Sequence, residues 1–247
     1  MVWLFALTLF VSALLLFLVT FACWQLLLLL RRATGDERLG MLPLLLGITC
    51  AAIALTHWMA LWLVLGLAIA CAVLLKGHRG AVVVIVLLPV LAVGGWWTRN
   101  AMVCGDMLGA SRSLAASVLS VYPESVQSRD FDKGALPVNL ASLIRKVNLN
   151  LSGQVSNLYD HLLGVVPAML FFLALLHRFR RADVNALRWA LALIWLGGFV
   201  GMALIGLPDK EQDDNQLHLL LLPGLTVMGL AGLAVVWGRL SPGSGGV

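Results

Sequence analysis

The chain has 247 residues, of which 61% are hydrophobic and only 12% charged, and its mean hydropathy is +0.96. Because soluble domains carry about 25% charged residues, this composition excludes an ordinary soluble protein. The net charge of +5 comes from basic joints between apolar runs, which indicates contact with anionic lipid headgroups and no nucleic acid partner. The four cysteines show no metal-binding or redox spacing.

Charged residues divide the chain into apolar runs that are long enough to cross a membrane. A helix rises about 1.5 Å per residue, so about 20 uncharged residues span a hydrocarbon core of about 30 Å. The runs predict seven spans, two of which lie within 39–75 and are joined by a tight hairpin at Thr56-His57. The other spans are expected within 1–30 and at 80–98, 161–176, 189–207 and 217–238. Since backbone polar groups cannot face lipid unpaired, and the runs do not alternate, we expect an all-α, polytopic transmembrane bundle.

The distribution of Lys and Arg predicts the orientation of this bundle. Ten of the 17 basic residues lie in three joints and after the last span, and the positive-inside rule places these segments in the cytoplasm. The chain then divides into spans one to four (1–98), an outer-face, periplasmic loop (99–156), spans five to seven (157–238) and a cytoplasmic tail (239–247). We therefore predict an integral protein of a bacterial inner membrane.

The start of the chain predicts that a segment precedes it. Seven spans with a cytoplasmic C-terminus leave Met1 outside, although the first residues lack the basic region and cleavage site of a signal peptide. An outside N-terminus followed at once by an uncleaved apolar run is unusual. We therefore expect the chain to be the C-terminal part of a longer protein, with an odd number of spans upstream.

The outer loop has aliphatic residues at helical spacing. The pattern predicts two amphipathic helices, at about 110–121 and 138–152, separated by a polar, turn-like stretch. Pro137 opens the second helix, and Asn139 is its candidate cap. Such helices either pack as a plain hairpin on the bundle or form a lid over a substrate cavity, and both interpretations stay open.

The first candidate site residues stand at the end of the fourth span. Arg99 and Asn100 follow the pair Trp96-Trp97 and open the outer loop. One interpretation of the arginine is an interfacial anchor within an aromatic belt. The other is a guanidinium that binds a phosphate, for which its planar fork of donors is suited.

Further candidates lie at the other outer joints. The joint 208–216 is either a solvated acidic turn or a rim that binds an acceptor or a cation. Lys210 stands inside it, and His218 follows at the level of the headgroups. His57, in the hairpin on the same side, is either an interfacial polar residue or a substrate contact. No ligand spacing is diagnostic for a metal, so no metal site is predicted.

These segments resemble the polytopic GT-C glycosyltransferases, the superfamily that includes protein O-mannosyltransferases and the lipid A aminoarabinose transferase. Trp96-Trp97-Thr98-Arg99-Asn100, followed by Gly105, is similar to a span that ends in an aromatic-Xaa-Xaa-Arg-Asn stretch. Residues 44–57 are similar to a span that closes in Leu-Thr-Lys or Leu-Thr-Arg, with His57 in place of the basic residue.

A third similar segment comes later in the chain. Residues 215–223 resemble an entry into a late span of the Arg-Tyr-Leu-Leu-Pro type, with Gln216-Leu217 in place of the Arg-Tyr pair. The order and spacing of the segments extend the resemblance over about residues 10–235.

The resemblance implies transfer of a sugar from a polyprenyl-phosphate carrier to a protein, lipid or glycan acceptor on the outer face. It implies no further cofactor and leaves the use of a divalent metal open. The family's catalytic base is an Asp in the first outer loop, whereas the first outer joint here is the hairpin without a carboxylate. The catalytic residue is therefore unknown and expected before the start of this chain. The resemblance and the outer-face position together predict a set of residues that contact the sugar donor or the acceptor. These are Arg99, Asn100, His57, Lys210 and His218.

Two other classes of function stay open. A complete seven-span protein would suit a non-enzymatic scaffold or assembly role, which the scarcity of charges within the spans favours over a transporter. A transporter would also show interrupted helices in matching halves. The pairs Gly94-Gly95 and Gly197-Gly198 indicate close helix packing instead.

Overall fold

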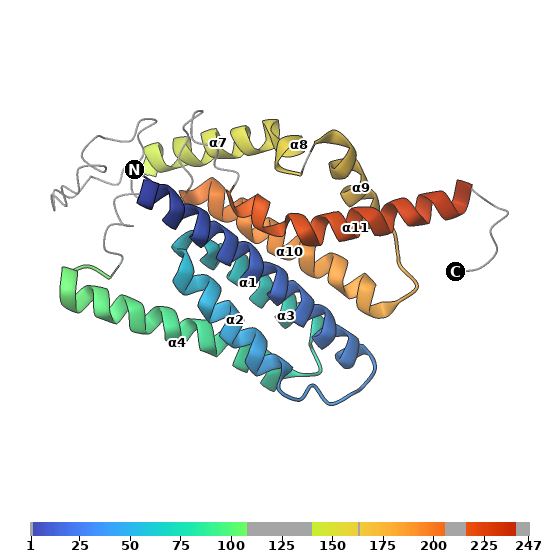
Figure 1. Ribbon diagram of the computed structural model, residues 1–247, viewed down its shortest axis with the longest axis horizontal. Helices are drawn as coiled ribbons and strands as arrows, with labels where there is room; N and C mark the ends of the chain where they lie inside the picture. Colours follow the sequence, from blue (N-terminus) through green and yellow to red (C-terminus); the bar gives the residue numbers. More distant parts are fainter. Residues whose placement is uncertain (1, 108–139, 163, 206–215, 241–247) are drawn as a thin grey trace.

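The computed structural model describes residues 2–107, 140–162, 164–205 and 216–240, and their regular structure is entirely helical (Figure 1). The first part holds α1 (Val2–Thr34), α2 (Leu42–Thr56), the 3-10 turn η1 (Trp58–Ala60), α3 (Leu61–Leu74) and α4 (Arg79–Cys104). The second part holds α7 (Leu140–Ser156), α8 (Leu158–His161), α9 (Val165–Leu176), α10 (Ala182–Ile205) and α11 (Gln216–Leu240). The all-α prediction is confirmed for the described residues.

Four helices, α1, α4, α10 and α11, are long and apolar enough to cross a membrane, which indicates an integral membrane protein. Their apolar stretches contain 22 to 25 residues. In contrast, α2, α3 and α9 have 15, 14 and 12 residues. At about 1.5 Å per residue, these three extend only about 18 to 23 Å, which is less than a hydrocarbon core of about 30 Å. Full-length spans are therefore found at four of the seven predicted places within the described residues.

Local signals in the sequence set several helix ends. Pro43 stands in the first turn of α2, where a backbone N–H has no intrahelical partner in any case. The same helix ends at Thr56, and η1 follows directly, which confirms the predicted hairpin. Gly105 ends α4 with a left-handed φ of 69°, and its N–H donates to the carbonyl of Ala101 over 3.1 Å.

Figure 1 shows that the joints of the bundle gather at two ends. The joints 35–41, 75–78 and 177–181, each of which carries Arg or Lys, lie toward the lower right of the view, and we call this the basic end. The start of α1, the Thr56-His57 hairpin and the C-terminus of α10 lie toward the upper left, which we call the hairpin end. The helix α7 runs along the top of the view and packs against α10.

The closest helix contact joins α3 to α10. A Cβ atom added to Gly197 would lie 2.7 Å from the carbonyl oxygen of Trp62 and 2.9 Å from Cα of Gly66, so only glycine allows this approach. An added Cβ at Gly94 or Gly95 on α4 would meet nothing within 4 Å. The close packing predicted for the glycine pairs is thus present at Gly197 and absent from the described surroundings of the pair on α4.

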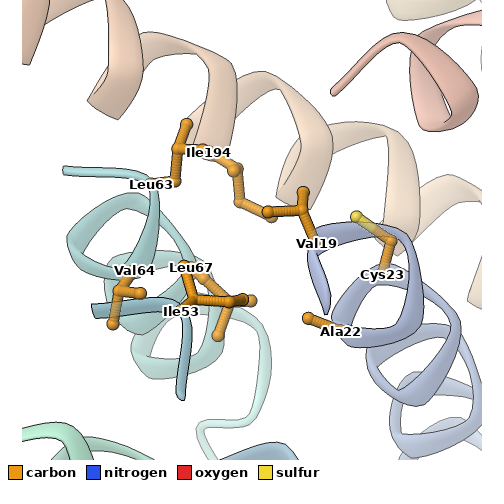
Figure 2. Close-up of a pocket in the computed structure, with 8 residues that line it drawn as sticks. All are labelled: Val19, Ala22, Cys23, Ile53, Leu63, Val64, Leu67 and Ile194. Atoms are coloured by element: carbon orange, nitrogen blue, oxygen red, sulfur yellow. The ribbon is translucent and has the colours of Figure 1, made fainter. Parts of the chain in front are cut away.

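A small void lies near the centre of the bundle, among the helices that the structure describes. Where α1, α2, α3 and α10 meet, a void of about 10 Å³ remains between side chains that are apolar apart from one thiol (Figure 2). A space of this size holds one water molecule at most, and a water needs several polar partners. The void is therefore a small gap in dry packing, lined by Val19, Ala22, Cys23, Ile53, Leu63, Val64, Leu67 and Ile194.

Candidate functional site

The helix α7 turns its polar side toward the bundle. Lys146, Asn150 and Gln154 recur every four residues and therefore lie on one face of the helix. All three side chains are buried, and Lys146 is only 1% exposed. On the other faces, Ile144 and Val155 are 53% and 58% exposed. The second helix predicted in the outer loop is confirmed at 140–156, and the face that it buries is the polar one.

Asn150 ties α7 to the end of α10. Its amide nitrogen Nδ2 donates to the carbonyl oxygens of Met202, at 3.5 Å, and of Ala203, at 3.2 Å. These two carbonyls belong to the last turn of α10. A side chain on one helix thus hydrogen-bonds to the backbone of another helix.

His218, in the first turn of α11, joins the same group. Its side chain is 1% exposed, and its Nε2 lies 3.4 Å from Oε1 of Gln154. In the tautomer that carries the proton on Nε2, the imidazole donates to this amide oxygen. The ring centroid lies 6.2 Å from that of Trp195 and 6.4 Å from that of Phe199, both on α10. The structure therefore places His218 inside the protein, between two aromatic rings and an amide.

We call Lys146, Asn150, Gln154 and His218 the polar cluster. It contains an ammonium group, two amides and an imidazole, all buried at the hairpin end of a bundle of apolar helices. A buried cation among further hydrogen-bond donors suits an anion such as a phosphate group. Among the described residues, no three His, Cys, Asp or Glu side chains come together as a candidate metal site.

Arg99 and Asn100 lie on a different part of the bundle. Arg99 is exposed near the end of α4, while Asn100 is buried and its Nδ2 donates to the carbonyl of Met107 over 3.5 Å. The helix α4 packs on α2 and α3, whereas α11, which carries His218, packs on α1, α9 and α10. Figure 1 shows the end of α4 well away from α7. The structure thus separates Arg99 from the polar cluster.

His57 occupies the cap of α2 in the hairpin. Its N–H donates to the carbonyl of Ile53 over 3.3 Å, and its own carbonyl accepts from Ala60 over 2.9 Å. Burial lowers the pKa of the imidazole below its ordinary value, which favours the neutral ring at pH 7. A neutral ring acts as a hydrogen-bonding group rather than as a cation for phosphate.

Other predicted features fall outside the described residues. These are Lys210 with the acidic joint around it, and the first loop helix at about 110–121. Lys146, Asn150 and Gln154 were not predicted as site residues. Their four-residue spacing indicates one helix face, but the prediction of this helix was based on its aliphatic residues.

Comparison with protein-family models, with curated proteins and with solved structures finds no match to this chain. The likeness to GT-C glycosyltransferases therefore rests on the sequence segments alone.

Proposed function

We propose that the chain is part of a polytopic membrane glycosyltransferase of the GT-C type. It moves a sugar from a polyprenyl-phosphate carrier to an acceptor at the outer face of the membrane. The observation that carries the proposal is the polar cluster, in which a lysine 1% exposed and a histidine 1% exposed lie at one end of an apolar bundle. Such a transferase needs a phosphate-binding group beside lipid, because the carrier's phosphate leaves the sugar while its isoprenoid tail stays in the bilayer.

In this proposal the basic joints face the cytoplasm and the hairpin end faces outward, following the positive-inside rule. The short helices α2, α3 and α9 complete seven spans, and local thinning of the bilayer accommodates their length. The helix α7 then lies at the outer surface as a lid. Its exposed side chains Ile144, Leu149 and Val155 contact acyl chains, and its polar stripe faces the substrate.

Each member of the polar cluster has a role in this proposal. Lys146 and His218 stabilise the phosphate as its negative charge grows during cleavage of the bond to the anomeric carbon. Gln154 orients the imidazole through the 3.4 Å contact, and Asn150 holds the lid on α10. The base that deprotonates the acceptor is not assigned to a residue. Arg99 is the alternative phosphate ligand, on α4.

The test is sugar transfer from a labelled pool of polyprenyl-phosphate sugars, in membranes that contain the full-length protein. We expect Lys146→Met to lower transfer about tenfold or more, because a hydrogen bond to a charged group contributes about 1.5 to 3 kcal/mol. Arg145→Met is the matched control, since Arg145 is the exposed cation next along the same helix. Sugar transfer by the Arg145→Met variant should stay within about twofold of that by the unsubstituted protein.

Two further results would decide against parts of the proposal. If Arg99→Ala abolishes transfer and Lys146→Met does not, the phosphate site lies on α4 and not in the polar cluster. If no donor in the pool supports transfer, the transferase is rejected in favour of a non-enzymatic scaffold or assembly role. Equal amounts of each variant in the membrane, measured by immunoblot, separate these results from a failure to fold.

A further inference from the structure

A second polar site lies at the basic end, where α9 connects to α10. The joint 177–181 and the first turn of α10 surround an open cavity of about 310 Å³. The side chains of Arg178 and Arg180 line it and are exposed. Two cations thus stand at the mouth of a space that is large enough for a phosphate-bearing headgroup.

A buried cation belongs to the same region. Arg188 on α10 is 6% exposed, and neither its Nε nor its Nη1 has a hydrogen-bond partner among the described residues. The residue one turn earlier on the same face, Asn185, lines the cavity, and its Oδ1 is also buried without a partner there. The positive charge of Arg178 acts on the Arg188 guanidinium, so the two cations repel each other across this region.

Asp183, the acidic residue in the first turn of α10, already has an ion-pair partner. Asp183 accepts from Nη2 of Arg181 at 2.6 Å and from Nε at 3.2 Å, and its Oδ1 also accepts from the N–H of Val184 at 2.9 Å. This bidentate pair leaves the carboxylate bound to Arg181. Within the described residues it therefore does not serve Arg188. A buried guanidinium beside further cations is costly unless an anion completes the site.

We infer that this joint binds the phosphate of an anionic phospholipid. Arg178 and Arg180 contact the phosphate oxygens at the mouth of the cavity, and Arg188, one turn along α10 from Asn185, supplies a buried positive charge beside it. The surroundings favour a lipid over a free phosphate ion. Leu176, directly before the joint, is 84% exposed, and Trp189, whose ring centroid lies 5.2 Å from Cζ of Arg188, is 49% exposed. These side chains provide apolar surface for acyl chains beside the headgroup site.

The test is lipid binding to the full-length protein in detergent, measured by native mass spectrometry with phosphatidylglycerol and phosphatidylcholine. We expect the original protein to retain phosphatidylglycerol at concentrations at which phosphatidylcholine is lost. The double variant Arg178→Gln with Arg180→Gln, and separately Arg188→Gln, should weaken phosphatidylglycerol binding about tenfold or more. Arg79→Gln is the matched control, because Arg79 is an exposed cation at the start of α4, next to another basic joint, and it should change binding by about twofold or less.

Equal loss in the control and in the joint variants would overturn the inference, because the attraction would then be a diffuse property of the basic end. Displacement of phosphatidylglycerol by an equal concentration of inorganic phosphate would overturn the lipid assignment. If Arg188→Gln fails to accumulate, the double variant decides alone, since both of its residues are exposed. Sugar transfer is not measured, so the result is independent of the proposed glycosyltransferase activity.

Discussion

The helix α10 meets two neighbours in opposite ways. Against α3 it presents Gly197, and the backbones approach so closely that a Cβ atom there would lie 2.7 Å from a carbonyl oxygen. Against α7 its last turn presents carbonyl oxygens, and Asn150 donates to them at 3.5 and 3.2 Å. One interface is apolar and determined by shape, and the other is polar and determined by hydrogen bonds.

The difference between the two interfaces follows from their positions along α10. In the middle of the bundle, apolar helices gain little from leaving lipid for one another, so small residues and close backbones supply the contact. At the hairpin end, the last turn of α10 presents backbone carbonyls to α7, and the amide of Asn150 donates to two of them. These hydrogen bonds, in addition to apolar packing, favour the burial of this face of α7.

The largest effect on stability is expected at Gly197, where the backbones of α3 and α10 approach closely. Gly197→Ala places a methyl group against the carbonyl of Trp62 and Cα of Gly66, neither of which moves without shifting a helix. We expect the free energy of unfolding to fall by about 1 to 3 kcal/mol or more, the usual effect of overpacking. The measurement is reversible unfolding in mixed detergent–SDS micelles.

Gly94→Ala is the control for this substitution. It adds the same methyl group to α4, where an added Cβ meets nothing within 4 Å. Its unfolding free energy should stay the same or rise slightly, since alanine favours a helix over glycine. If both variants lose equal stability, the close contact between α3 and α10 is not formed as described.

The polar interface should respond to the loss of its donor. Asn150→Leu keeps the size of the side chain but leaves the carbonyls of Met202 and Ala203 without this partner. We expect a loss of about 1 to 3 kcal/mol in the unfolding free energy, measured in the same micelles. Asn148→Leu is the matched control, because Asn148 is exposed on the same helix, and its effect should stay within about 0.5 kcal/mol. A larger loss at Asn148 would mean that α7 packs through another face.

The helices themselves were largely predictable from the sequence, because uncharged runs of this length have few alternatives to helix in lipid. The ends of the helices were less predictable, because a charged residue indicates where the chain meets water and not where a helix ends. Thus α10 begins at Ala182 and continues through Arg188, seven residues before the predicted start at 189. In contrast, Gly164, with a φ of 101°, precedes α9, which shortens the predicted run 161–176 to 165–176.

The candidate site was harder to predict than the fold. An amphipathic pattern shows that a helix has two faces, but in a membrane both faces have suitable neighbours, because lipid accepts the apolar one. The burial of Asn150 goes with its hydrogen bonds to the end of α10, a contact that exists only in the assembled bundle. His218 was singled out from its place in the sequence, but its partner Gln154 is 64 residues away and becomes visible only in three dimensions.

The smallest of the expected effects concerns the hairpin, where the apolar interface begins. Burial lowers the pKa of His57 below its ordinary value of about 6.5, so the unfolded chain binds this proton more readily than the folded protein does. Stability should therefore be constant above about pH 6.5 and fall as the pH drops below it, until the folded protein is protonated too.

His57→Asn keeps a polar cap at the end of α2 but removes this titration, so the difference between the two unfolding profiles should appear only below about pH 6.5. The effect is small because the imidazole is half-buried and water screens part of its charge. The same fall in both proteins would assign the titration to another group. It would also mean that protonation of the His57 ring does not destabilise the hairpin.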